Sequence, residues 1–162
     1  MACIQYPHAK KEAHPIPAEP LDKFCYDKGC FVELSSATKL KGFQLQESWT
    51  PKGASGIGTR QGFVKVPMLV GEKGGSSFRL EFEGRAVGIF CVAGPKACTL
   101  EYRTDKGPWK TLDTKTEWSN GLYIPWVYMF EKELPEGTHI LQVRIAKGEL
   151  TECQIRNFVV NR

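Results

Sequence analysis

The side chains that could carry out hydrolysis are few and lie far apart in the sequence. A serine or cysteine nucleophile needs a base within hydrogen-bond reach, and the three histidines are His8, His14 and His139. The first two lie in a proline-rich stretch, and His139 opens a predicted strand directly after a turn. The sequence contains neither a G-x-S-x-G nor an H-E-x-x-H motif. We therefore expect the chain by itself to be non-catalytic, with these histidines solvated or structural.

Paired carboxylates are a second source of chemistry to consider. Glu81 with Glu83, and Glu131 with Glu133, are each separated by one residue and have a basic neighbour. Residues two apart on a strand share one face of a sheet, so we expect these pairs to serve solubility and cross-strand pairing. A glycosidase dyad joins carboxylates from separate elements across a cleft, and these pairs do not fit that description.

The cysteines do not form a metal-binding pattern. The six cysteines are Cys3, Cys25, Cys30, Cys91, Cys98 and Cys153. No C-x-x-C occurs, and only three histidines could complete a zinc site. We expect mostly free, buried thiols, because cysteine behaves as a small core hydrophobe. If the protein is secreted, Cys25 with Cys30 and Cys91 with Cys98 are close enough in sequence to form disulfides.

Composition and charge exclude several classes of ligand. A length of 162 residues and an apolar fraction of 41% suffice for one domain with a hydrophobic core. The net charge of +4 comes from 22 basic residues spread among 18 acidic ones, so we expect no nucleic-acid partner. No apolar run approaches a membrane span and the start lacks a signal-peptide pattern, so we expect no membrane partner. Asp22, Asp27 and Asp113 are too scattered to support structural calcium, and we expect no cofactor.

Most of the chain shows the patterns of β-strands. Residues 77–84 alternate Phe78, Leu80 and Phe82 with charged side chains, as a half-buried strand does. Residues 86–93 are continuously apolar, which is typical of a strand buried on both faces. We predict further strands at 31–34, 42–49, 63–70, 99–104, 109–112, 139–145 and 153–160. Since no helical periodicity persists for three turns, we predict an all-β fold, an antiparallel β-sandwich resembling a jelly roll.

Prolines and glycines mark the boundaries within the chain. Residues 1–20 carry four prolines and little to bury, so we predict a linker or extended arm there and a β-sandwich module over 21–162. Residues 50–62 contain four glycines and form a predicted loop that lacks the spacing of a phosphate-binding loop. Pro67 interrupts one predicted strand and suits either an edge strand or a bulge.

The densest group of aromatic residues lies at 118–131, with the sequence W-S-N-G-L-Y-I-P-W-V-Y-M-F-E. Its first half contains serine, asparagine, glycine and proline, and we predict irregular backbone there. Trp and Tyr combine an apolar ring face with a polar edge, which suits them to stack on sugars. We predict stacking on Trp118, Tyr123 and Trp126, with Trp109 and Trp49 as further candidates and hydrogen bonds from Asn120, Glu117 or Lys115.

A structural alternative exists for the second half of this segment. Trp126, Tyr128 and Phe130 alternate after Pro125, so they could form one face of a strand that packs in the core. Trp118 and Tyr123 belong to the predicted loop and are less readily explained in this way. The two interpretations differ in whether the aromatic side chains are exposed.

A resemblance to a known family extends over about residues 17–161. It is carried by four segments, which are F-E-G-R-A-V-G-I-F-C-V-A-G-P-K-A-C-T-L-E-Y-R-T-D-K-G-P-W-K-T-L-D, W-S-N-G-L-Y-I-P-W-V-Y, L-P-E-G-T-H-I-L-Q-V-R-I and C-Q-I-R-N-F-V-V-N. Together they resemble the β-sandwich accessory domain of bacterial SGNH/GDSL-type esterases, which include carbohydrate acetylesterases acting on plant polysaccharides. The resemblance implies that the catalytic Ser, Asp and His lie in a separate SGNH domain upstream, with residues 1–20 as the junction.

Two functions are compatible with this resemblance. The first is a non-catalytic carbohydrate-binding module for a plant cell-wall polysaccharide such as xylan or glucomannan. The second is a structural accessory domain that packs on the SGNH esterase domain in cis and shapes its active-site cleft without binding glycan. A contiguous apolar patch would favour the second function, and a groove rimmed by polar groups the first. If the parent enzyme acts on polysaccharide, we expect it to be secreted or on the cell surface rather than cytoplasmic.

Overall fold

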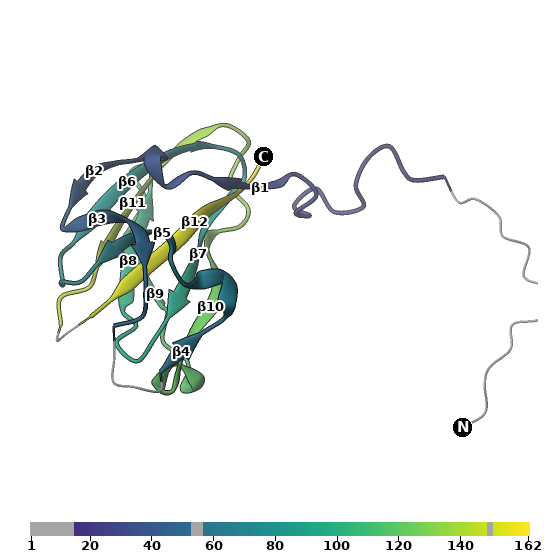
Figure 1. The fold of residues 1–162 in the computed structure, drawn as a ribbon. Coiled ribbons are helices and arrows are strands. Elements are labelled where there is room, and N and C mark those ends of the chain that lie inside the picture. The colour runs from purple at the N-terminus through teal and green to yellow at the C-terminus, as the bar shows by residue number, and fades with distance from the viewer. Residues whose placement is uncertain (1–14, 53–56, 149–150) are drawn as a thin grey trace, which may run out of the picture.

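The chain folds as two β-sheets packed face to face, with an extended N-terminal arm (Figure 1). This computed structural model describes residues 15–52, 57–148 and 151–162. The strands are β1 (Gly29–Val32), β2 (Ala37–Lys41), β3 (Phe43–Trp49), β4 (Gly58–Thr59), β5 (Val66–Gly71), β6 (Ser77–Glu83), β7 (Ala86–Ala93), β8 (Thr99–Thr104), β9 (Lys110–Asp113), β10 (Leu122–Glu131), β11 (Thr138–Ile145) and β12 (Cys153–Asn161). Three short 3-10 helices are η1 (Leu34–Ser36), η2 (Gln61–Phe63) and η3 (Glu117–Asn120). Within the described ranges, no helix is long and apolar enough to cross a membrane.

The two sheets differ in the number and order of their strands. The seven-stranded sheet has the order β3-β5-β12-β7-β10-β4, with β1 also pairing with β12. The five-stranded sheet has the order β2-β6-β11-β8-β9. Among the described residues, all the paired strands are antiparallel except β4 with β10, which are parallel. The predicted all-β sandwich is confirmed, and the sequence did not indicate its one parallel pair.

The core lies between the inner faces of the two sheets. In β6 the apolar members of the alternating pattern, Phe78, Leu80 and Phe82, are all buried, as predicted. They face side chains such as Ile89 and Phe158 of the larger sheet, which belong to the same core cluster. Each such side chain contributes roughly 1.5–3 kcal/mol when it leaves water. The period-2 alternation of β6 therefore fixes which face of this sheet is left to solvent.

Pro67 lies within a central strand at an irregularity of its neighbour. β5 is hydrogen-bonded to both β3 and β12, but its pairing with β12 covers only Leu69, Val70 and Gly71, so at Pro67 the strand has a neighbour on the β3 side alone. The register between β3 and β5 shifts between Gln46 and Trp49, opposite Pro67. A proline has no N–H to donate to the ladder, and such an irregularity removes the need for one. The bulge alternative is confirmed.

The described part of the N-terminal arm is tied to the sandwich shortly before β1 begins. Its residues 15–28 contain no strand. The Arg85 guanidinium donates from Nη1 to the carbonyl oxygen of Lys23 at 3.0 Å, and the Asn161 amide donates from Nδ2 to that of Cys25 at 2.9 Å. Arg85 also pairs with Glu136 at 2.6 Å. These contacts place the end of the arm beside β12 and β7.

The five described cysteines are free thiols. Neither Cys25 with Cys30 nor Cys91 with Cys98 is joined in this structure, and Cys3 lies outside the described residues. Burial raises the pKa of Cys91 well above its ordinary value, so its thiol is inert toward electrophiles at neutral pH. Cys91, Cys98 and Cys153 are buried in the core and pack there as small hydrophobes.

Candidate functional site

Two of the five predicted stacking residues are core residues. Trp49 and Tyr123 are each only 2% exposed, and their rings make an edge-to-face contact with centroids 5.4 Å apart. They form a second core cluster on the outer side of the larger sheet, with partners Met68, Val70 and Val92. Neither ring face is open to a ligand, so we do not retain Trp49 or Tyr123 as ligand-binding residues.

Tyr123 is buried because strand β10 begins earlier than the sequence suggested. The strand starts at Leu122, so Tyr123 is a strand residue rather than a loop residue. Its hydroxyl donates to the carbonyl oxygen of Lys52 at 3.1 Å and to Oε2 of Glu152 at 3.2 Å. Burial, with the nearby Glu152 charge, raises the pKa of Tyr123 to about 12. A Cβ at Gly94 would meet the Tyr123 ring at 2.3 Å, so the glycine makes room for it.

Two other predicted stacking residues, Trp118 and Trp126, are exposed. Trp118 is 68% exposed and Trp126 is 57% exposed. Trp118 lies in η3, which a capping box between Thr116 and Ser119 stabilises and which packs against β10. The predicted hydrogen-bonding residues, which are Lys115, Glu117 and Asn120, are all exposed in the same segment.

The position of Trp126 follows from the pairing of β10 with β7. Trp126 is opposite Cys91, a core residue, so its side chain leaves the sheet on the inner side. Two residues further on, Tyr128 also faces inward, and its hydroxyl donates to the Thr114 carbonyl oxygen at 2.7 Å. That bond ties the segment before η3 to β10. The strand alternative is thus correct for Tyr128 and Phe130, whereas Trp126 emerges at the open edge of the sandwich.

The fifth predicted residue, Trp109, lies on the outer face of the five-stranded sheet. It precedes β9 and is 39% exposed. The guanidinium carbons of Arg144 and Arg103 lie 4.1 and 4.9 Å from its ring centroid. A groove of about 320 Å³ runs beside it, lined by Lys39, Ser77, Phe78, Arg79, Trp109, Gln142, Val143 and Arg144. We call this the Trp109 groove.

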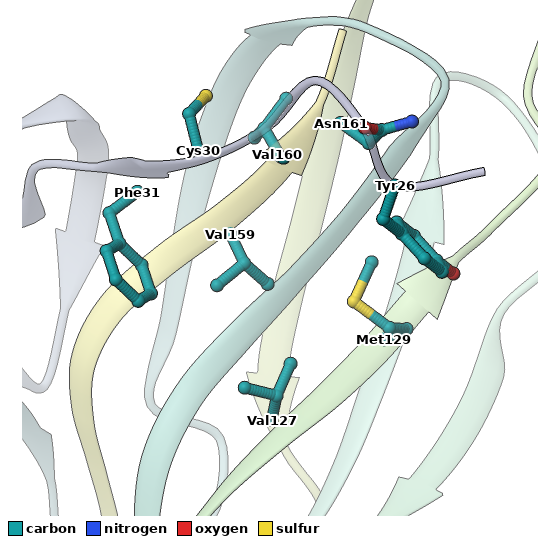
Figure 2. Close-up of a pocket in the computed structure, with 9 residues that line it drawn as sticks. Tyr26, Cys30, Phe31, Val127, Met129, Val159, Val160 and Asn161 are labelled. Atoms are coloured by element: carbon teal, nitrogen blue, oxygen red, sulfur yellow. The ribbon is translucent and has the colours of Figure 1, made fainter. Parts of the chain in front are cut away.

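A second groove, almost entirely apolar, lies on the outer face of the larger sheet. It has a volume of about 330 Å³ and is lined by Tyr26, Gly29, Cys30, Phe31, Val127, Met129, Val159, Val160 and Asn161. Figure 2 shows Phe31 of β1, Val159 of β12 and Val127 and Met129 of β10 on one side of the sheet. Phe31 is 64% exposed and also stacks on Phe90 of β7, with centroids 6.0 Å apart. We call this the apolar groove.

A glycine of β7 lies between the two strands whose side chains line the apolar groove. Gly88 of β7 is paired with Met129 on one side and Val159 on the other. A Cβ at Gly88 would lie 2.8 Å from the Met129 sulfur, so a side chain there would collide with one wall. The close packing of β10 on β7 therefore requires glycine at this position.

His139, the only histidine among the described residues, has a structural environment. Its Nδ1 lies 2.9 Å from Oδ2 of Asp105 and its Nε2 lies 2.8 Å from the Pro135 carbonyl oxygen. Burial by itself lowers the pKa of His139, but these two hydrogen bonds and the Asp105 charge together raise it above its usual value. Both ring nitrogens face acceptors, so neither is placed to take a proton from a nucleophile. His8 and His14 lie outside the described residues.

The carboxylate pairs likewise have structural environments. Glu81 and Glu83 are exposed on the outer face of β6. Glu131 accepts bonds from the Lys110 ammonium at 2.7 and 2.9 Å, which links β10 of one sheet to β9 of the other. Among the described residues, no group of three or more His, Cys, Asp or Glu is arranged to hold a metal ion.

Solved structures with a similar fold come from enzymes that act on polysaccharides. The chain is similar to a two-domain esterase active on acetylated mannans, co-crystallised with mannopentaose (18% identity, TM-score 0.60), covering 92% of this chain and 40% of that one. The structure described without that sugar gives 16% identity, TM-score 0.59 and coverage of 93% and 40%. An exo-β-1,3-galactanase from Phanerochaete chrysosporium is similar at 11% identity and TM-score 0.54, with coverage of 81% and 29%.

This likeness shows the fold alone. The identities lie below the level at which function follows from similarity, and the chain spans less than half the length of each of these enzymes. No protein-family model matches the sequence, and no curated protein matches it. The function of this chain therefore has to follow from the chemistry of its own surfaces.

Sequence reasoning missed the partners of Trp109 and the whole of the apolar groove. Arg79, Gln142 and Arg144 lie at outward positions of strands that the sequence predicted, so their orientation was available from the period-2 pattern. Their proximity to one another was not, because it depends on the strand order. Phe31 and Val159 come from strands that are 128 residues apart in sequence but directly paired.

Replacing the two kinds of tryptophan should separate core from surface roles. We expect Trp49→Ala to lower the free energy of unfolding by about 3–5 kcal/mol, because it leaves a cavity beside Tyr123. We expect Trp118→Ala to change it by less than about 0.5 kcal/mol. Urea unfolding followed by far-UV circular dichroism measures both. Equal losses for the two variants would contradict the assigned burial.

The Asp105 and His139 pair should give a pH-dependent contribution to stability. The hydrogen bond from His139 lowers the pKa of Asp105, and the pKa of His139 is raised. Asp105→Asn removes the charge and keeps the shape, so it should cost stability when both groups are ionised in the wild type, above about pH 4 and below about pH 6.5. The cost should shrink as the pH rises through the folded pKa of His139.

We expect that cost to be at most about 1 kcal/mol, because Asp105 is 49% exposed and water screens the pair. Urea unfolding of the wild type and Asp105→Asn at several pH values measures it. A difference that is constant with pH, or that grows above neutral pH, would contradict this assignment.

Proposed function

We propose that this chain is a non-catalytic carbohydrate-binding module that binds plant cell-wall polysaccharide by aromatic stacking. The observation that carries the proposal is the exposure of Trp118 and Trp126, 68% and 57%, on backbone held by defined contacts. A capping box fixes the η3 turn under Trp118, and Trp126 lies within a paired strand. Exposed indoles on such backbone present a large apolar area to a ligand.

A glycan fits the chemistry around these two residues. A pyranose ring has one apolar face for an indole and hydroxyl groups around its rim for hydrogen bonds. The exposed polar side chains near Trp118 supply a carboxylate in Glu117, an amide in Asn120 and an ammonium in Lys115. Such a combination of an aromatic ring and a few polar groups is the usual composition of a small-ligand site.

The proposal places catalysis elsewhere in a longer parent protein. The resemblance of the sequence to esterase accessory domains and the likeness in fold to a two-domain esterase both support an esterase parent. His139 has both ring nitrogens occupied by acceptors, which supports a non-catalytic role for this part of it. We expect the SGNH esterase domain to be joined in cis, with residues 1–20 as the junction and residues 21–162 as the module.

The binding proposal predicts that polysaccharide affinity depends on the two exposed tryptophans. We expect Trp118→Ala and Trp126→Ala each to weaken binding at least about tenfold, since a tryptophan at the centre of an interface contributes more than about 1.4 kcal/mol. Affinity gel electrophoresis with xylan, glucomannan and cellulose derivatives in the gel measures this. Leu45→Ala is the control, because Leu45 is 47% exposed on the distant strand β3. Absence of binding to every glycan, or equal binding by all variants, would contradict the proposal.

The apolar groove favours a second function, docking onto the esterase domain. Its lining is almost wholly apolar, and Phe31 and Val127 are 64% and 43% exposed, so this face lacks the polar rim of a sugar site. Apolar patches of this kind mark interfaces. The chain before β1 also contacts the sandwich here. Tyr26 lines the groove, and the carbonyl oxygen of Cys25 accepts a hydrogen bond from the Asn161 amide. A domain preceding the arm would therefore be connected to the module on the side where this groove lies.

The docking proposal predicts association in trans. We expect this chain to bind the separately produced catalytic domain of its parent protein, and Val127→Glu to weaken that complex at least about tenfold by placing a charge in the interface. Leu45→Glu, which changes an exposed apolar residue on another strand, should leave it unchanged. Isothermal titration calorimetry measures both. Self-association that Val127→Glu abolishes, with no binding to the catalytic domain, would contradict docking in cis.

A further inference from the structure

We propose that the Trp109 groove binds the carboxylate groups of an acidic polysaccharide, one that contains uronic acid. The inference rests on the proposed function only in taking the ligand to be a glycan. It concerns a different face of the molecule from Trp118 and Trp126. Positive charges, hydrogen-bond donors and an indole lie together on the outer face of the five-stranded sheet.

Strand pairing gathers these side chains into one row. Gln142 of β11 is opposite Arg103 of β8 on one side and Arg79 of β6 on the other. Neighbouring strands lie about 4.8 Å apart, so three strands place these groups within about 10 Å of one another. Trp109 lies over the row from the β9 side, since both Arg103 and Arg144 contact its ring. Residues 79, 103, 142 and 144 are separate in the sequence, and the strand order makes them one surface.

The charge of this groove is positive. Of the described residues that line it, Lys39, Arg79 and Arg144 are cations and none is a carboxylate. Arg79 has Glu81 only at 3.9 Å, the outer limit of an ion pair. Arg103, at the groove's edge, donates from Nε and Nη2 to the neutral Gln142 amide oxygen at 3.2 and 2.9 Å. Arg79 and Arg103 therefore keep much of their charge for a ligand, whereas Arg144 shares its charge with Glu101.

The groove also presents donors in the geometry that a carboxylate requires. Arg144 donates from Nε to Glu101 at 2.5 Å, and within the described residues no hydrogen bond is formed by its two terminal nitrogens. A guanidinium offers paired N–H groups that match the two oxygens of a carboxylate. The oxygen of the Gln142 side chain accepts from Arg103, so its NH₂ group is left to donate to a hydroxyl. A sugar that bears both a carboxylate and hydroxyls matches this set.

Trp109 acts here as a positioning residue as well as a surface. Its indole lies 4.1 Å from the Arg144 guanidinium, a cation–π contact that holds the flat group in place. An arginine that is already ordered loses less side-chain entropy when it binds an anion. The half-exposed ring then closes one end of the groove. The groove is thus preformed in the chain without ligand.

A second hollow extends the cationic track. It has a volume of about 510 Å³ and shares Arg144 with the Trp109 groove, and Lys41 and Lys147 also line it. Glu101 is the one carboxylate among its described lining residues, and it is paired with Arg144. A polymer with carboxylates at intervals can follow such a track. Elsewhere the basic and acidic residues are interspersed, which does not suit a nucleic acid with its denser charge.

The test is affinity electrophoresis through gels that contain polygalacturonate, neutral glucomannan or heat-denatured DNA. We expect retardation by polygalacturonate, weakened about tenfold or more in Arg144→Ala and in Arg79→Gln, because each removes a charge-assisted contact. Arg144→Lys, which keeps the charge but not the paired donors, should lie between. Lys132→Ala removes one exposed cation outside the groove and should bind as the wild type does.

Two controls test whether binding is electrostatic and whether each variant is folded. Raising NaCl from about 0.1 M to about 1 M shortens the screening length from about 10 Å to about 3 Å, and should abolish retardation by polygalacturonate. Thermal unfolding checks that each variant is folded, and Arg79→Gln keeps the inference testable if Arg144→Ala is not. Trp118→Ala should leave polygalacturonate binding intact.

The outcomes separate this inference from the proposed function. Binding to glucomannan but not to polygalacturonate would overturn the inference and leave the proposed function standing. Binding to neither glycan would overturn both. Retardation by polygalacturonate that the arginine variants do not change, or binding to DNA as tight as to polygalacturonate, would also overturn the inference. Binding to polygalacturonate that requires Arg79 and Arg144 supports it.

Discussion

The structure depends on the burial of strand β7, which is apolar along its whole length. Its inner side packs Val87, Ile89 and Cys91 against the five-stranded sheet. The outer side of β7 has different neighbours at its two ends. The cluster of Trp49 and Tyr123 covers one end, and the apolar groove lies beside the other. A strand buried on both faces needs a cover on each. Within this chain Phe90 is the one residue of β7 that is only half-buried, and the apolar groove proposed for docking is lined by the ring of Phe31 that stacks on it.

The burial of β7 also explains why some aromatic side chains are buried and others are exposed. Once the outer side of β7 is covered by Trp49 and Tyr123, these two rings are lost to ligand binding. Trp118 and Trp126 lie at the edge of the sandwich, where their rings remain exposed. Trp109 lies on the outer face of the opposite sheet among arginines. The molecule therefore has three separate surfaces with different chemistry, an apolar groove, an aromatic edge and a cationic groove.

Much of the fold could be predicted from the sequence, and much less of the site. The alternating pattern of 77–84 predicts a strand buried on one face, and the continuous apolar run of 86–93 predicts a strand buried on both. Both predictions are confirmed by β6 and β7. Gly121 and Pro125 predict a loop around Tyr123, but Tyr123 pairs with Thr59 of β4 and the next residue pairs with β7, so it is a strand residue. The grooves could not be predicted, because they join residues from strands whose order no local pattern specifies. The need for glycine at position 88 likewise becomes apparent only once its two neighbouring strands are known.

The most direct test of the account uses the four tryptophans as reporters. Each gives one indole N–H signal in a ¹H–¹⁵N spectrum, and substitution to phenylalanine assigns it. Titration with a neutral oligosaccharide of glucomannan should shift the signals of Trp118 and Trp126 and leave that of buried Trp49 unchanged. Titration with an oligogalacturonate should shift that of Trp109. No change in any indole signal with either sugar would contradict the claim that this chain is a carbohydrate-binding module.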